Sequence, residues 1–265
     1  MRKALIAASY LICLLLLIVP LIKLFQGAGE QGFASIWSTL TRQDVLHALW
    51  VTGLITLIVT ILNVLFGVLL SLTLARDTRL SRRFRQFLNS LVDLPFAVSP
   101  VIAGLMIVLL LGPNTIIGAF FEGVGTPIVF ALPGMVLATL FVTFPFTVRE
   151  VLPVLQEIGT QQEEAAFTLG AGRWTTFWRV TFPSIRFAIY YGIVLTVARS
   201  LGEFGAVLVV SGNIVNQTQT ATIFVYQEVE NFNFAAANSV ALVLALLSIT
   251  TLLLLEWTKK RKGAL

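Results

Sequence analysis

The sequence predicts an all-α integral membrane protein with about six transmembrane helices. Of its 265 residues, 57% are hydrophobic and only 12% are charged, and the mean hydropathy is +0.91. A soluble domain has about 25% charged residues, so this chain has too few charges to cover a globular surface. Apolar stretches of about 20 residues recur along it, each long enough to cross a hydrocarbon core of about 30 Å as a helix. Helices are favoured because lipid offers no hydrogen-bond partner to a free backbone N–H or C=O.

The apolar stretches define six candidate spans. Helix-disturbing residues interrupt the third and fourth spans at Pro95, Pro100, Gly104, Pro133 and Pro145. Such interruptions are tolerated in a membrane only where protein or a water-filled cavity satisfies the freed backbone groups, so we expect these two spans to face protein or a cavity. The six spans cover residues 4–22, 47–75, 91–111, 127–148, 186–210 and 235–255.

Basic residues predict the orientation, because cytoplasmic segments of membrane proteins carry an excess of lysine and arginine. With both termini in the cytoplasm, fifteen of the eighteen basic residues lie inside, against Lys23 and Arg42 outside and Arg199 within a span. The apolar run that follows Arg2 and Lys3 exceeds the roughly 7 to 15 residues of a signal peptide and no cleavage site follows it, which favours a transmembrane helix. The fifteen inside residues are Arg2, Lys3, Arg76, Arg79, Arg82, Arg83, Arg85, Arg149, Arg173, Arg179, Arg186, Lys259, Lys260, Arg261 and Lys262.

The spans divide the chain into three parts. Residues 1–45 hold a lone first helix and an external connection, residues 46–256 a denser block of five helices, and residues 257–265 a basic cytoplasmic tail. His47 is the only histidine and Cys13 the only cysteine, and they lie in different spans, so we expect no metal site. The sequence has no G-x-x-x-x-G-K-[ST] phosphate loop, so we expect no ATP hydrolysis and no catalytic residues in this chain.

The longest predicted cytoplasmic loop contains a polar segment that is unusual for this chain. Its run EEAAFTL combines strong helix formers with acids at the start, which suits a helix N-terminus. Gly170 and Gly172 permit a sharp stop, and an amphipathic stretch then predicts a second short helix before Pro183 begins the next span. From the residues alone, the two helices either stand out from the membrane or lie in its interface with their aromatic residues among the headgroups.

Arg199 and Glu203 lie four residues apart in the fifth predicted span, on one face of a helix. An ionisable residue within a membrane is costly and is a functional candidate by default, although the two charges could simply neutralise each other. Gly202 between them could let the helix bend or let the backbone approach a ligand. We therefore predict that Arg199, Glu203 and Gly202 belong to a translocation pathway or a gate, where the arginine could offer paired donors to a tetrahedral oxyanion.

Three further acids have weaker signals. Asp93, at the start of the third span, is expected to pair with an arginine of the 76–85 cluster. The stretch QTQTATIFVYQEVENFNF forms either a solvated loop or an external helix, in which Glu228 and Glu230 could help to dock a soluble protein.

From Glu164 the chain reads E-A-A-x3-G-x9-V-x-F-P, which closely resembles the EAA motif of ABC importer permeases, E-A-A-x3-G-x9-I-x-L-P. The two departures, Val180 and Phe182, keep apolar side chains. The stretches LVDLPFAVSPVIAGL, FPFTVREVLPVL and LGEFGAVLVVSGNI are similar to the sulfate/molybdate branch of these permeases, and in particular to its sulfate/thiosulfate subunits. This resemblance covers nearly the whole chain from about residue 40. We call residues 161–185 the EAA segment.

The resemblance implies the type I importer permease fold, with about six helices and a permease core over residues 46–256, in a bacterial-type inner membrane. In that family the EAA segment sits in a groove of a cytoplasmic ATPase subunit. The resemblance therefore assigns ATPase coupling to Glu164, Ala165, Ala166, Gly170, Gly172 and Pro183. It implies two copies of the ATPase, which would bind the ATP and Mg²⁺, a second related permease and an extracytoplasmic sulfate-binding protein. Membrane lipid is the remaining partner, and we expect no nucleic acid and no cofactor in this chain.

The implied function is a permease subunit that forms the pathway of an ATP-driven sulfate/thiosulfate importer. A molybdate or tungstate importer is an alternative within the same branch, and the second permease could be another copy or a relative. A secondary transporter that works alone, with broken helices around a midplane site, is the alternative from another class. The EAA segment favours the importer, because a self-sufficient transporter has no use for it.

Overall fold

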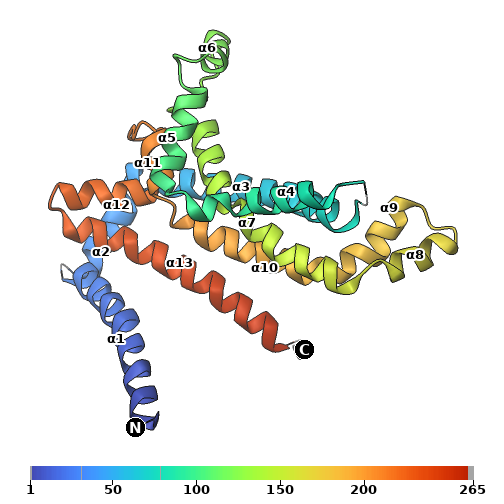
Figure 1. The fold of residues 1–265 in the computed structure, drawn as a ribbon. Helices are drawn as coiled ribbons and strands as arrows, with labels where there is room; N and C mark the ends of the chain where they lie inside the picture. Colours follow the sequence, from blue (N-terminus) through green and yellow to red (C-terminus); the bar gives the residue numbers. More distant parts are fainter. Residues whose placement is uncertain (1, 31, 78, 262–265) are drawn as a thin grey trace.

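The structure is a computed structural model that describes residues 2–30, 32–77 and 79–261, and every regular element in these ranges is helical (Figure 1). Five helices in this part of the chain are long and apolar enough to cross a membrane, and a bent pair, Arg82–Ala97 with Pro100–Leu111, supplies a sixth candidate crossing. The predicted all-α membrane fold with about six spans is confirmed. The cytoplasmic position of the termini stays a prediction.

The helices differ greatly in length, from single turns to 34 residues. They are α1 Arg2–Gly29, α2 Phe33–Leu40, α3 Gln43–Arg76, α4 Arg82–Ala97, α5 Pro100–Leu111, α6 Ile116–Gly123, α7 Leu132–Ile158, α8 Gln161–Thr168, α9 Arg173–Thr176, the π-helix η1 Phe177–Thr181, α10 Phe182–Leu201, α11 Gly205–Val210, α12 Ala221–Glu230 and α13 Phe234–Arg261.

The centre of the molecule is the three-helix packing of α3, α7 and α10. Thr147 of α7 is fully buried between the other two helices. A Cβ added at Gly67 of α3 would lie 2.8 Å from the Thr147 side chain, and one added at Gly192 of α10 would lie 2.9 Å from the Thr147 Cα. Glycine at both positions therefore permits the close approach of backbones that small residues give to membrane helices.

Buried polar side chains also favour one orientation of these packed helices relative to each other. Asn63 of α3 donates from Nδ2 to Thr143 Oγ1 of α7 at 2.7 Å, and both residues are fully buried. The hydroxyls of Thr139 and Thr143 in turn donate to carbonyl oxygens four residues earlier in α7. Because lipid offers no alternative partner, the Asn63–Thr143 bond favours one rotation of α3 relative to α7.

The third predicted span is not one straight helix. The chain breaks at Val98 and Ser99, and α4 and α5 meet at an angle of 111°. Pro100 occupies the first position of α5, where a missing N–H costs nothing because the first N–H groups of a helix have no partner within it. Gly104 of α5 is buried against α11, and a Cβ there would lie 2.5 Å from Ala206 O. The break therefore lets α5 turn onto α11 and α7.

Two other predicted span boundaries are wrong. The fourth span was expected over residues 127–148, but α7 begins at Leu132 and continues for ten residues beyond 148 to Ile158. The fifth was expected over residues 186–210, but its helix begins at Arg173, ends at Leu201 and resumes only as the separate α11. Arg149, which suggested the end of the fourth span, is accommodated within α7 because it has specific partners on α4, described below.

The first helix stands apart from the core. In Figure 1, α1 diverges from the bundle, and it packs mainly on α13. The predicted basic tail over residues 257–265 is helical as far as Arg261, and its last four residues lie outside the described part of the chain. The predicted division into residues 1–45, 46–256 and 257–265 stays a prediction.

The contact at Thr147 generates a stability prediction. We expect Gly67→Ala to lower the free energy of unfolding by about 1–3 kcal/mol, because its methyl group would overpack against Thr147. Gly53→Ala is the matched control in the same helix, since no atom lies within 4 Å of the Cβ it would add. Thermal unfolding of the two variants in detergent compares them, and equal stability would contradict the close crossing.

Candidate functional site

The EAA segment begins with α8 and α9, which project at one extremity of the molecule beyond the ends of α4, α7 and α10 (Figure 1). α8 ends in a closed turn around Gly170, whose φ is +83°. Gly170 N donates to Phe167 O and Ala171 N to Ala166 O, both at 3.0 Å. These are the two hydrogen bonds of a Schellman motif, which places a left-handed residue, usually glycine, just after the helix.

The two glycines of the segment have different roles in the backbone. Gly170 takes a conformation that is costly for any residue with a Cβ. Gly172 is extended, with φ −73° and ψ 162°, and precedes α9. The structure thus places the predicted sharp stop at Gly170, whereas Gly172 has ordinary dihedral angles.

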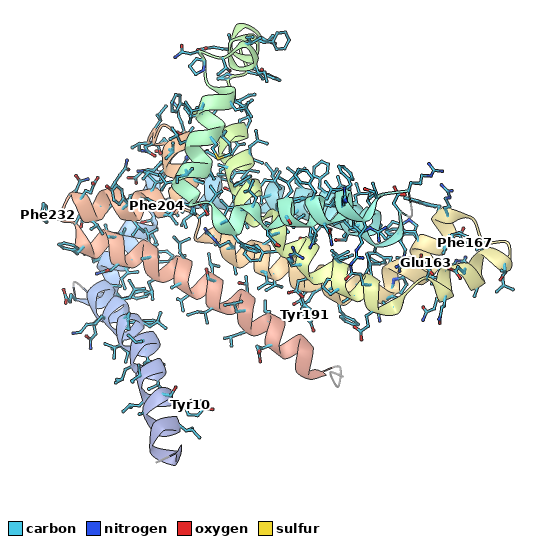
Figure 2. The ribbon with its side chains drawn as sticks, in the orientation of Figure 1. Tyr10, Glu163, Phe167, Tyr191, Phe204 and Phe232 are labelled. Atoms are coloured by element: carbon cyan, nitrogen blue, oxygen red, sulfur yellow. The ribbon has the colours of Figure 1, made fainter. Side chains whose placement is uncertain are left out.

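The outer surface of this projection is partly apolar. Leu169 and Trp174 are 89% and 74% exposed, and Phe167 and Trp178 are also exposed. Figure 2 shows Phe167 farther out along α8 than Glu163. Ala165 is exposed and Ala166 is half-buried. Exposed apolar residues gathered at a projecting tip are typical of a protein–protein contact.

The two consecutive glutamates of α8 have different surroundings. Glu164, the motif residue, is exposed, and its Oε1 accepts from Thr160 Oγ1 at 2.6 Å. Glu163 lies at the base of α8 (Figure 2) and pairs with Arg76, the last residue of α3, whose Nε donates to Oε2 at 3.0 Å. The other oxygen of Glu163 accepts from Thr181 Oγ1 at 2.9 Å. The sequence did not single out Glu163, Arg76 or Thr181 for a role in this segment, because the motif names only the neighbouring glutamate.

Pro183 does not begin a span, contrary to the prediction. It lies inside a continuous helical stretch that runs from Arg173 to Leu201. The π-turn of η1 immediately precedes it, and Phe182 N donates to Phe177 O, five residues earlier. Proline lacks an N–H and clashes with the carbonyl four residues before it. The wider π-turn accompanies this proline within an unbroken helix, as π-bulges commonly do at functional sites.

A second arginine ties α7 to α4. Arg149 donates from Nε to Asp93 Oδ1 at 2.8 Å, and a second bond joins its Nη2 to Asp93 Oδ2. Its Nη1 also donates to Asn89 Oδ1 at 3.0 Å. The prediction that Asp93 pairs with the 76–85 cluster is wrong, because the geometry of α4 turns this carboxylate towards α7.

Arg199 and Glu203 form an ion pair near the other end of α10. Arg199 Nη1 lies 2.8 Å from Glu203 Oε2, and the side chain of Glu203 is 1% exposed against 34% for Arg199. Glu203 Oε1 accepts from Ala206 N at 2.9 Å, and Glu203 O accepts from Thr222 Oγ1 at 2.7 Å. Gly202 follows the last residue of α10. The three predicted pathway residues therefore meet at the break between α10 and α11.

The stretch expected as either a loop or an external helix contains the helix α12, which buries Ile223 and Phe224. Glu228 lies 3.5 Å from Arg42 Nη2, and Tyr226 OH donates to Glu230. The hydrogen bond to Glu230 raises the pKa of Tyr226 above its ordinary value. Both acids proposed for docking thus have partners within the chain. Among the described residues, no three His, Cys, Asp or Glu side chains are grouped as a metal ion would require.

Comparison with known proteins identifies the family. The family described as binding-protein-dependent transport system inner membrane component matches residues 67–263. The chain belongs to this family. It is therefore a multi-pass membrane protein and a non-catalytic permease component of an ABC import complex.

Similar proteins cover almost the whole of this permease. The sulfate transport system permease protein CysW of Synechocystis sp. is 48% identical over 99% of this chain and 94% of its own length. CysW of Escherichia coli is 43% identical over 96% of this chain and 87% of its own length. CysT of Escherichia coli, also a sulfate transport system permease protein, is 34% identical over 97% and 92%. The resemblance to CysW-type permeases inferred from the sequence is confirmed.

The fold of this permease also matches solved structures. A chain of a bacterial alginate ABC transporter, crystallised with an alginate pentasaccharide-bound periplasmic protein, has a TM-score of 0.80 and 18% identity, covering 98% of this chain and 94% of its own. A second crystal structure, of a bacterial ABC transporter involved in alginate import, has the same TM-score at 19% identity, covering 98% and 95%. The ABC permease fold is confirmed.

The different conformations of the two glycines generate a prediction. We expect Gly170→Ala to destabilise the end of α8 by about 1–2 kcal/mol, because alanine is strained at a positive φ. Gly172→Ala should have little effect, since its φ is ordinary and no atom lies within 4 Å of an added Cβ. Limited proteolysis of the EAA segment measures the difference. Equal cleavage rates in the two variants would show that the turn at Gly170 is not a constraint.

Proposed function

We propose that this permease forms the transmembrane pathway of an ATP-driven importer of sulfate and thiosulfate in a bacterial-type inner membrane. The observation that carries the proposal is the similarity to CysW proteins, at 43–48% identity over nearly the full chain. CysW and CysT are both sulfate transport system permease proteins, and the lower identity to CysT supports a CysW-like role beside a CysT-like second permease. Two copies of an ATPase subunit, which bind ATP and Mg²⁺, and an extracytoplasmic sulfate-binding protein complete the proposed complex.

In this proposal the EAA segment couples the permease to the ATPase. Glu164, Ala165, Ala166 and the Gly170 turn form a compact knob, and the exposed Leu169 and Trp174 provide apolar contact area at its tip. Movement of this knob passes in two directions. The backbone of α9 and η1 carries it into α10, and the contacts of α8 carry it towards α7 and α3.

The ion pair of Arg199 and Glu203 lies where such movement would change the pathway. It joins the end of α10 to the start of α11, and α11 packs against the bent helix α5. A guanidinium offers planar donors to an oxyanion. We assign Arg199, Glu203 and Gly202 to a gate of the pathway, in which Glu203 neutralises Arg199 in the state described here.

Uptake of radiolabelled sulfate by cells that lack the gene, with and without a plasmid copy, tests the substrate. We expect the plasmid to restore uptake, and an excess of thiosulfate to block it because both anions use the same complex. Gene-dependent accumulation of molybdate without sulfate uptake would instead assign the permease to the molybdate and tungstate importers. If neither anion depends on the gene, the proposed substrate class is wrong.

The gate assignment has its own test. Arg199→Gln leaves the buried Glu203 without its counter-ion, so we expect a loss of stability somewhat below the roughly 3–5 kcal/mol for a fully buried pair. Arg199→Gln with Glu203→Gln removes both charges and should recover much of this stability. Under the gate assignment, sulfate uptake stays low in the double variant. If uptake recovers together with thermal stability, the pair is only structural.

A further inference from the structure

We infer that Arg76 is a positioning residue that fixes α8 to the transmembrane core through Glu163. The two consecutive glutamates of the EAA segment then have different roles in coupling. Glu163 faces the core, and Glu164 is left to face the ATPase. This inference rests on the proposed coupling role of the segment and adds the connection by which α8 acts on α3 and α7. Figure 2 shows Glu163 at the junction of the projection with the bundle.

The guanidinium of Arg76 joins three elements. Its Nε donates to Glu163 Oε2 at 3.0 Å, its Nη1 to Leu155 O at 3.0 Å and its Nη2 to Gly159 O at 2.7 Å. Leu155 is near the end of α7 and Gly159 follows that end, where backbone carbonyls have no partner within the helix. A positive charge is favourable at this helix terminus. Lysine could not reproduce the contact, because it lacks the planar array of donors.

Glu163 extends the connection to a fourth element. Its second oxygen accepts from Thr181, which is buried in η1. The side chains of Arg76 and Glu163 are only 18% and 16% exposed. Apolar residues Ile158, Val180 and Ile185 lie around them. The pair is therefore screened much less by water and salt than an ion pair on the surface.

The covalent link between α7 and α8 is by itself a weak means of passing a movement of α8 on to α7. It passes through Gly159, with φ +67° and ψ −163°, a conformation essentially restricted to glycine. The closest packing of α8 is against α9 and η1, not against α3 or α7. A glycine joint lets α8 swing relative to α7, and the Arg76–Glu163 pair opposes that swing. Without the pair, α8 would keep its route through α9 and η1 into α10 but would lose its direct connection to α3 and the end of α7.

Arg76→Gln and Glu163→Gln test the inference in the complete complex with its ATPase. We expect both variants to retain the ATPase during purification and to hydrolyse ATP, because Glu164 and the tip of the projection are unchanged. Sulfate transported per ATP hydrolysed in proteoliposomes should fall about tenfold or more, as expected for loss of a hydrogen-bonded charge. Arg76→Lys should give an intermediate ratio. The matched controls are Arg79→Gln and Glu157→Gln, which remove the same charges from exposed neighbouring positions.

Hydrogen exchange of the α8 amides provides a readout that does not depend on the substrate. These amides should exchange about tenfold faster in Arg76→Gln and Glu163→Gln than in the controls, because α8 is no longer held by the pair. Unchanged exchange in both variants overturns the inference. A coupling ratio equal to that of the controls, or loss of the ATPase from both variants, overturns it as well.

Different results would contradict the role of Arg76 and the proposed function. An unaltered complex that hydrolyses ATP but takes up no sulfate contradicts the proposed substrate, whatever the exchange rates show. An unaltered complex that transports sulfate, with variants that couple normally, contradicts only the role of Arg76. Should Arg76→Gln fail to accumulate in the membrane, Glu163→Gln removes the same charge interaction without removing the donors to the α7 carbonyls.

Discussion

The close crossing of α3, α7 and α10 at Thr147 is the constraint on which the rest of the structure depends. Glycines at residues 67 and 192 place two helix backbones against this one threonine, and the Asn63–Thr143 bond favours one rotation of α3 against α7. Sliding one helix would bring a larger side chain into the contact or leave a polar group without a partner in lipid. The three helices therefore move together, and α7 and α10 are the helices that lead into and out of the EAA segment. A rigid core of this kind can turn a displacement of a short external helix into a displacement of the whole bundle.

Three arginines connect the helices of this core to neighbouring elements. Arg76 joins the ends of α3 and α7 to α8, Arg149 joins α7 to α4, and Arg199 joins α10 to the start of α11. Each arginine bonds a carboxylate from another element or from beyond the end of its own helix. The planar guanidinium suits these junctions because it offers several donors in fixed directions. In a chain with 12% charged residues, Arg76 and Arg149 therefore serve a second purpose besides the predicted orientation, because they also bind one helix to another.

Composition and hydropathy predict the all-α membrane fold because the lipid environment leaves the backbone so few choices. They do not predict whether the chain bends at a given proline or continues through it as a helix. Pro100 begins a helix after a sharp bend, whereas Pro145 lies buried within α7, and the difference comes from packing partners far away in the sequence. The same limitation explains the wrong partner for Asp93, whose arginine is 56 residues away. Glu163 was missed for another reason: Glu163 and Glu164 are chemically identical, and only the position of α3 distinguishes them.

One continuous helix connects the two candidate sites. The stretch from Arg173 to Leu201 has 29 residues, or about 43 Å at about 1.5 Å per residue, and the proline of the EAA motif does not break it. A helix boundary at Pro183 would leave the EAA segment separate from the membrane helix. Instead, the π-turn of η1 joins the end of the EAA segment to α10 in one continuous helix. A tilt imposed at α9 therefore reaches the end of α10, where the helix stops before Gly202. The Arg199–Glu203 pair spans that stop, so a change of angle between α10 and α11 acts directly on the pair. One helix thus carries the end of the EAA segment at its start and Arg199, the arginine of this pair, near its end.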